Sequence, residues 1–185
     1  MPPDFELQPT LSGSLVVLRP LRAEDFDVLY RAASDPLIWE QHPEPDRYTP
    51  PVFRRYFDGA MASKGAFAIV DRATGRVIGS SRYCDLDVER GEVEVGYTFL
   101  ERAYWGGAYN GEVKALMLAH AFRFLPRVIF KVGESNLRSQ KALLKIGARL
   151  ESRLSESDPT SPNRLVFVIT RPPTSEPLAR SPHNR

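Results

Sequence analysis

Two strand-turn-helix units follow one another in the middle of this chain, and both helices begin with small or polar residues. In the first unit, alternating apolar residues over residues 92–100 lead through a glycine-containing turn into an apolar helix predicted over residues 110–124. In the second, a β-like run over residues 128–132 precedes a helix that Gly147 ends. A strand that ends at a helix start directs free backbone N–H groups and the positive end of the helix dipole toward one point. The first unit therefore predicts an anion site suited to phosphate.

The turn of the first unit reads Tyr-Trp-Gly-Gly-Ala-Tyr-Asn-Gly over residues 104–111. Its glycines leave room for a ligand to approach the backbone, and Asn110 tolerates left-handed geometry. An alanine held at positive φ would cost about 1–2 kcal/mol, so we expect Ala108 either at an ordinary φ or in a slightly reshaped turn. A turn of this composition is also compatible with having no ligand.

With both units, the chain resembles the GCN5-related N-acetyltransferases over residues 13–170, and most of all the RimJ/RimL-like branch of ribosomal-protein N-terminal acetyltransferases. In that family the first turn follows the pattern Gln/Arg-x-x-Gly-x-Gly/Ala and holds the pyrophosphate of acetyl-CoA. The chain departs from the pattern at Trp105, Ala108 and Asn110. The resemblance, with the positive charges of the second helix start, implies cofactor contacts from Phe99, Leu100, Trp105, Gly106, Gly107, Ala108, Tyr109, Asn110, Gly111, Asn136, Arg138, Ser139 and Lys141.

The start of the second helix resembles the Asn-x-x-Ser arrangement of the same family, here Asn136 and Ser139. The resemblance implies that Asn136 contacts the cofactor and that Ser139 lies near the thiol sulfur. A helix cap and a first-turn polar residue are the alternative, and capping is compatible with a cofactor contact. Many family members carry a Tyr seven residues after this Asn to protonate the thiolate. Because Leu143 stands there, Ser139 is the predicted substitute and Tyr109 a weaker one.

Acyl transfer from a thioester needs a neutral amine, donors for the carbonyl oxygen and a proton for the departing thiolate. Strand alternation puts Glu92 and Glu94 on one face of residues 92–100. Glu94 precedes Val-Gly-Tyr and thereby resembles a family sequence, so we predict that Glu94 is the base or part of a water-mediated proton relay. An exposed strand residue is the alternative. Cys84 is a less favoured covalent acceptor of the acetyl group, because no His is near it in the sequence.

The residues after the first helix offer candidates for the acceptor side. In a fold of this type Trp39, Glu40 and His42 would line the acceptor cleft together with Tyr83, and an aromatic, acidic rim can hold a cationic amine. A loop with one anchoring Trp is the alternative. His120 falls on the polar arc of its helix, so we predict a solvated position for it and expect no metal site.

The composition suits one globular domain, with 185 residues, 42% of them hydrophobic, and a net charge of +2. We expect this domain over residues 13–171, after an N-terminal segment (1–12) and before a disordered tail (172–185) poor in apolar residues. Basic residues are scattered among acidic ones, which argues against a nucleic-acid partner, and no apolar run has membrane-spanning length. The single cysteine and the lack of a secretory pattern indicate the cytoplasm. A monomer or homodimer is expected.

The order of predicted elements is strands first, then two strand-helix units, then a hairpin, which indicates an α/β fold with a sheet of mixed strand direction. The same order is expected of the acetyltransferase fold, with a mostly antiparallel sheet of six or seven strands and about four helices. The predicted strands cover residues 15–18, 67–71, 76–85, 92–100, 128–132, 148–154 and 165–170, and the first two helices cover residues 22–34 and 52–63.

These observations predict an acetyl-CoA-dependent N-acetyltransferase that lets a primary amine attack the thioester directly in a ternary complex. The amine is a protein N-terminus or a small molecule such as a polyamine, an aminoglycoside or an amino-acid-like toxin. A module that binds CoA without catalysis is the alternative, because Ala108 and the missing Tyr depart from the family pattern. A dinucleotide-binding protein fits less well, because the chain lacks a Gly-x-Gly-x-x-Gly run.

Overall fold

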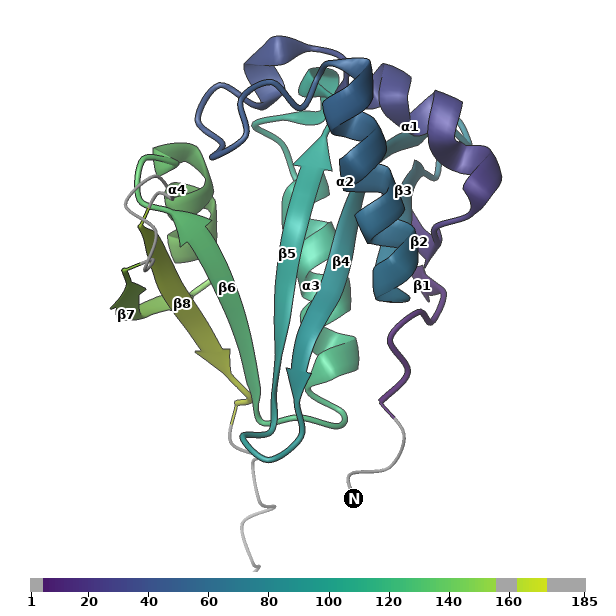
Figure 1. The fold of residues 1–185 in the computed structure, drawn as a ribbon. Coiled ribbons are helices and arrows are strands. Elements are labelled where there is room, and N and C mark those ends of the chain that lie inside the picture. The colour runs from purple at the N-terminus through teal and green to yellow at the C-terminus, as the bar shows by residue number, and fades with distance from the viewer. Residues whose placement is uncertain (1–4, 156–162, 173–185) are drawn as a thin grey trace, which may run out of the picture.

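One eight-stranded sheet forms the centre of the molecule (Figure 1). The computed structural model describes residues 5–155 and 163–172. The strands lie in the order β1-β2-β3-β4-β5-β6-β8-β7, and β5 and β6 are the parallel pair among otherwise antiparallel neighbours. Their bounds are β1 (Leu11–Ser12), β2 (Val16–Pro20), β3 (Ala66–Asp71), β4 (Val77–Asp87), β5 (Glu92–Leu100), β6 (Arg127–Gly133), β7 (Arg149–Leu154) and β8 (Arg164–Thr170).

The predicted α/β fold with a mixed, mostly antiparallel sheet is confirmed. The sheet has one strand more than the six or seven expected, because Leu11 and Ser12 pair with Leu18 and Val17 as a short edge strand. Two residues are too few to give a periodic pattern in the sequence. Four α-helices belong to the described residues: α1 (Phe26–Ala33), α2 (Pro50–Ser63), α3 (Tyr109–Ala121) and α4 (Leu137–Lys145).

The helices cover both faces of the sheet (Figure 1), with α2 in front and α3 behind in this view. On the α3 face, Val113 and Met117 pack on strand residues such as Val93, and Leu143 of α4 belongs to the same apolar cluster. On the opposite face, residues of α1 and α2 form a second apolar cluster with Phe99. Each face is thus closed by an apolar layer, which fixes the sheet between two sets of helices.

Strand β5 has an irregular pairing with β4 and separates from its other neighbour, β6. Its pairing with β4 runs from Ser80 with Phe99 to Arg82 with Gly96, so β5 has one residue more than β4 in this stretch, as in a β-bulge. Tyr97 in the bulge has a φ of 54°. The pairing of β5 with β6 covers only Glu92–Glu94 with Arg127–Ile129, and in Figure 1 the two strands separate toward their upper ends. Backbone groups of both strands are therefore available to a ligand between them.

The N-terminal segment folds back over α3 and corrects one prediction. Phe5 lies 5.2 Å from Tyr83 between ring centroids, and Nε2 of His120 lies 2.8 Å from the carbonyl oxygen of Glu6. His120 is buried, so its predicted solvated position is wrong. A helical wheel does not register a covering segment that is distant in the sequence. Residues 173–185 of the predicted disordered tail lie outside the described residues.

Candidate active site

The turn before α3 has the geometry of an anion cradle. Gly106 adopts a φ of +73°, whereas Ala108 lies at φ −79° and ψ −13°, so the alanine carries no left-handed strain. Ala108 occupies the N-cap position and has no side-chain group that could cap the first turn. A Cβ added at Gly107 or Gly111 would meet nothing within 4 Å, which shows open space beside the backbone. The turn therefore presents its N–H groups to an anion.

The two predicted cofactor residues Trp105 and Arg138 lie together. The guanidinium carbon of Arg138 is 4.2 Å from the centroid of the Trp105 ring, and Nε1 of Trp105 donates to the carbonyl oxygen of Leu100 at 2.9 Å. Arg138 also donates from Nη2 to the carbonyl oxygen of Ile38 at 2.8 Å and lies 3.4 Å from Oε1 of Glu40. These contacts join the start of α3, the start of α4 and the loop after α1. They also turn Glu40 toward Arg138.

The start of α4 is capped by side chains. Oδ1 of buried Asn136 accepts a hydrogen bond from the backbone N–H of Ser139 at 3.1 Å, and Oε1 of Gln41 accepts one from that of Arg138 at the same distance. The predicted helix-capping role of Asn136 is confirmed, and its contact with the cofactor stays a prediction. Ser139 is half-buried and Lys141 is exposed. The first turn of α4 thus has fewer free N–H groups for an anion than that of α3.

The side chain of Tyr109 contacts Asp71 and Tyr104. Its hydroxyl donates to Oδ1 of Asp71 at 3.2 Å, and its ring lies 4.8 Å from that of Tyr104. This anchors the start of α3 to the hairpin that joins β3 and β4. The hydrogen bond to Asp71 engages this hydroxyl, so it favours Ser139 over Tyr109 as the predicted proton source for the thiolate. The backbone N–H of Tyr109 belongs to the first turn of α3, as does that of Asn110. Both could donate to an anion.

Glu94 is a buried carboxylate at the end of the paired part of β5 and β6. Its Oε2 lies 2.8 Å from Nζ of Lys131, which is 2.6 Å from Oδ2 of Asp85. Burial raises the pKa of Glu94 above its ordinary value, although the Lys131 ammonium opposes the rise. A Cβ at Gly96 would lie 2.8 Å from Oε1 of Glu94, so the glycine makes room for this side chain. The alternative of an exposed strand residue is wrong.

Cys84 lies opposite Glu94 on β4. Burial raises the pKa of its thiol to about 12, and the charges of Glu94 and Asp85 add to the rise. The thiolate is the nucleophilic form of cysteine, so a thiol with this pKa is a poor acceptor for an acetyl group. The geometry therefore supports the sequence argument against covalent catalysis through Cys84.

The predicted acceptor residues divide between the two faces of the sheet. Trp39 is buried, with its Nε1 donating to the carbonyl oxygen of Ala33 at 2.7 Å. Burial and the nearby charge of Arg47 lower the pKa of His42 to about 3, so His42 is neutral. Tyr83 is a correction: it is fully buried on the α3 face, where its hydroxyl donates to the carbonyl oxygen of Met117 at 2.5 Å. It therefore does not line a cleft near Trp39.

Two buried arginines near Trp39 have no counterpart among the predicted residues. The guanidinium carbon of Arg47 lies 5.0 Å from the Trp39 ring and 4.9 Å from the Tyr56 ring, measured to the centroids. That of Arg82 lies 4.0 Å from the Tyr97 ring and 5.6 Å from the Tyr56 ring. Neither arginine belongs to a periodic pattern or a motif that would reveal it. With Phe99, these residues form what we call the arginine-aromatic cluster: Trp39, Arg47, Tyr56, Arg82, Tyr97 and Phe99.

Lys114 of α3 is a further buried charge that the sequence did not reveal. Its Nζ lies 2.5 Å from Oγ1 of Thr98 on β5 and 5.7 Å from the ring centroid of Phe130 on β6. Burial lowers the pKa of Lys114 to about 7. Since Thr98 and Phe130 lie beyond the paired parts of the two strands, Lys114 sits on the α3 side of the place where they separate.

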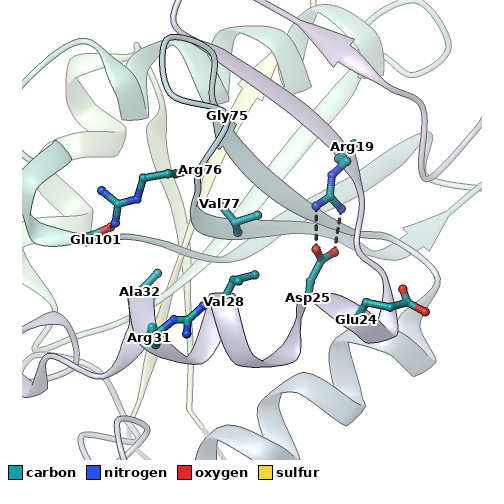
Figure 2. A pocket seen from close by; sticks show the side chains of 10 residues that line it. All are labelled: Arg19, Glu24, Asp25, Val28, Arg31, Ala32, Gly75, Arg76, Val77 and Glu101. Atoms are coloured by element: carbon teal, nitrogen blue, oxygen red, sulfur yellow. Dashed lines mark hydrogen bonds and ion pairs between the residues drawn. The ribbon is translucent and has the colours of Figure 1, made fainter.

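A hollow beside α1 contains charges that neutralise one another (Figure 2). Arg19 forms two 2.7 Å hydrogen bonds with the Asp25 carboxylate, and Arg76 lies 3.2 Å from Glu101. None of the predicted site residues lines this hollow, so we place the candidate active site at the separating strands. The described residues contain no group of three His, Cys, Asp or Glu side chains that could hold a metal ion. Within those residues, no helix has the length and apolar character needed to cross a bilayer.

Comparisons with known proteins identify similar sequences and folds. A family model described as an acetyltransferase (GNAT) domain matches residues 16–149. A curated relative, the uncharacterized N-acetyltransferase p20 of Bacillus licheniformis, is 28% identical over 170 residues, covering 86% of this chain and 92% of the relative. The structure of a GCN5-related N-acetyltransferase from Brucella melitensis aligns with a TM-score of 0.79 at 22% identity, over 92% of this chain and 80% of the other. RimJ of Mycobacterium smegmatis, solved with CoA-disulfide, aligns with a TM-score of 0.66 at 22% identity, over 88% and 87% of the two chains.

Proposed function

The chain belongs to the GNAT acetyltransferase family, and on this premise we propose that it transfers the acetyl group of acetyl-CoA to a primary amine. The observation that carries the proposal is the start of α3, which no side chain caps and which follows the strand β5 where β5 separates from β6. An uncapped helix start supplies donors for phosphate, and the separating strands supply donors and acceptors for an amide-containing chain. Both are features of the described residues themselves.

The residues present fit acetyl-CoA. The backbone N–H groups of residues 106–111 would hold its pyrophosphate, and the guanidinium of Arg138 and the exposed ammonium of Lys141 would add positive charge. Free backbone groups of β5 near Phe99 would hold the pantetheine amides. The carbonyl oxygen of Leu100 contributes less than predicted, because it already accepts from Trp105. When bound, acetyl-CoA supplies an acetyl group that is activated as a thioester.

We assign proton removal from the amine to Glu94. Its carboxylate is buried beside Lys131, and burial brings its pKa closer to neutrality, as suits a base. The remaining catalytic roles are proposed for Asn136, as a positioning contact, and for the half-buried hydroxyl of Ser139, as a proton source for the thiolate. Direct attack by the amine is favoured, because the Cys84 thiol stays protonated.

Within this family we favour a RimJ/RimL-like enzyme of the cytoplasm, working as a monomer or homodimer. The Asn136 and Ser139 arrangement resembles that branch, and the chain shares its fold with RimJ of Mycobacterium smegmatis. An N-terminal α-amine also asks less of a base than a lysine does, since the reference pKa values are about 7.7–8.0 and about 10.4. Polyamines and aminoglycosides are the other acceptors to be compared.

The test is release of free thiol from acetyl-CoA across N-terminal peptides, polyamines and aminoglycosides, with calorimetric titration of CoA in parallel. Turnover with one acceptor class would support the proposal and identify the type of amine. Tight CoA binding with no turnover for any amine would favour the non-catalytic module. If CoA failed to bind, the assignment of the α3 start as a phosphate site would be wrong.

A further inference from the structure

Arg82 is a buried positive charge without a carboxylate partner among the described residues. Its exposed fraction is 6%. The Nη1 and Nη2 groups donate to the carbonyl oxygens of Gly59 and Tyr56 at the long distances of 3.3 and 3.5 Å. Its Nε is buried and has no hydrogen-bond partner in the part of the chain that the structure describes. Burying an unpaired charge is costly, so an anion is the group that this site lacks.

Arg47 is a second buried guanidinium beside the Tyr56 ring. It is 4% exposed, and its Nε is likewise buried without a hydrogen-bond partner among the described residues. One Nη group reaches the half-exposed carboxylate of Glu44, and Nη1 lies 3.2 Å from Nε2 of neutral His42. The two guanidinium groups lie 4.9 and 5.6 Å from the Tyr56 ring. Two positive charges thus share one aromatic ring, with a single carboxylate at the rim.

The arginine-aromatic cluster borders the proposed base. Arg82 is the cross-strand partner of Gly96, and Cys84, the next residue on the same face of β4, is the partner of Glu94. The cluster also includes the bulge residue Tyr97, which is 45% exposed and whose ring lies 4.0 Å from the guanidinium carbon of Arg82. A turn of this exposed ring would open Arg82 to a ligand that enters beside Glu94.

We propose that Arg47 and Arg82 bind an anionic group of the acceptor, so that the acceptor is an amine that also carries a carboxylate or a phosphate. The inference rests on the proposed acetyl transfer and names its substrate class. The Nε and one Nη of a guanidinium form a fork that matches a carboxylate or phosphate with two parallel hydrogen bonds. This replaces the expectation of an acidic rim for a purely cationic amine, because Glu40 pairs with Arg138 and the cluster itself is positive.

Two arginines that line the hollow in Figure 2 show that an arginine on this face can have a carboxylate partner within the chain. Arg19 has a two-point contact with Asp25, and Arg76 pairs with Glu101. In both cases the described chain supplies the carboxylate itself. In the arginine-aromatic cluster it supplies backbone carbonyls, a neutral imidazole and one rim carboxylate. Arg76, whose side chain is exposed, therefore serves as a control for the loss of an arginine outside the cluster.

The experiment compares acceptors with and without the anionic group: glycine and alanine with glycinamide and alaninamide, and phosphoethanolamine with ethanolamine. Each is titrated calorimetrically into the CoA-loaded protein and assayed for acetylation. We expect the acid of at least one pair to bind about tenfold or more tightly than its neutral analogue. Arg82→Met and Arg47→Met should remove this preference, Arg82→Lys should restore part of it, and Arg76→Met should leave it unchanged. The carboxylate and phosphate pairs show which anion is preferred.

The outcomes separate the inference from the proposed function. Turnover of neutral amines with no preference for an acid would overturn the inference and leave the proposed function intact. Arginine-dependent binding of an acid, with no acetylation of any amine, would support the inference and count against the proposed function. Equal or absent binding of both members of every pair would overturn the inference, whatever the activity. Thermal melting and CoA affinity of each variant check folding, and the Arg47 variant remains informative if an Arg82 variant does not fold.

Discussion

The ammonium of Lys114 lies 2.5 Å from the hydroxyl of Thr98, where β5 has already left β6. Thr98 Oγ1 is in turn 2.7 Å from Oγ of Ser81 on β4. A residue of α3 thus contacts β5 at a point where β5 pairs with β4 but no longer with β6. Burial disfavours the charged form of the Lys114 amine and lowers its pKa to about 7.

Lys114 should make stability depend on pH above neutrality. Between about pH 7 and pH 10 the unfolded chain binds a proton at this amine and the folded chain does not, so the free energy of unfolding should rise with pH. The full difference is on the order of 5 kcal/mol. Lys114→Met should abolish the rise and stabilise the protein at pH 7, as measured by urea unfolding across this range. Exposed Lys145→Met is the control, and an unchanged slope in the Lys114 variant would refute the prediction.

The carboxylate of Glu112 should be needed to hold the N-terminal part of the sheet on α3. It accepts from the backbone N–H groups of Ser14, Leu15 and Val16 at 2.7–2.9 Å and from the Ser14 hydroxyl at 2.5 Å. Glu112→Gln replaces one oxygen by a donor that faces these N–H groups, so we expect a loss of about 1–3 kcal/mol in the free energy of unfolding. Glu89→Gln, on the exposed β4–β5 turn, is the control in chemical denaturation.

The pH dependence of this contribution has a definite sign. Burial alone would raise the pKa of Glu112, but the hydrogen bonds from Ser14, Leu15 and Val16 together lower it below its ordinary value. Its stabilisation is therefore complete above the unfolded pKa and is lost as the pH falls through the folded pKa. The difference in stability between wild type and Glu112→Gln should shrink in acid. A difference that stays constant down to pH 2 would contradict this.

Gly106 and Gly107 should respond differently to the same substitution. A Cβ has free space at both, but only Gly106 has a positive φ, at +73°. Gly106→Ala should therefore cost about 1–2 kcal/mol of stability, while Gly107→Ala should change it by a few tenths. Thermal melting of the two variants measures this directly. Equal losses would mean that the turn has a different backbone conformation.

Periodic patterns predicted most of the fold, and the reasons for the errors are local. The strand Glu92–Leu100 has the predicted bounds, but the bulge puts Phe99 in the apolar cluster opposite that of Val93 and Val95. The helix expected over residues 22–34 begins with a 3-10 turn at Ala23–Asp25, where Asp25 accepts from Arg19 and from the N–H of Arg22. Such a contact depends on a neighbouring strand and leaves no periodic trace in the sequence.

Short motifs pointed to the two helix starts at which the candidate site is placed. Asn136 caps its own helix, and Trp105 and Arg138 follow turns whose positions the motifs give. Arg82 was missed because its role depends on rings that the fold brings to it from other elements. Tyr83 was misplaced because adjacent strand residues point to opposite faces of the sheet. The local sequence does not indicate which face holds the acceptor cleft.

Glu94 should control the acid side of the rate profile. Because burial raises its pKa, the active carboxylate form is lost as the pH falls, and kcat/KM should fall with it. Glu94→Gln should remove this dependence and lower kcat about 100-fold to 10,000-fold without changing CoA affinity. Lys131→Met, which removes the ammonium 2.8 Å away, should move the fall to higher pH.

Glu92 provides the control for this prediction. It lies on the same strand and is equally buried, but it pairs with Arg90 and Arg127. Glu92→Gln should lower stability, since it leaves Arg127 with one carboxylate fewer, and should keep the pH profile of the wild type. Rate profiles of the three variants, read beside their melting temperatures, separate a base from a structural carboxylate. Wild-type turnover in Glu94→Gln would show that the proton leaves the amine by another route.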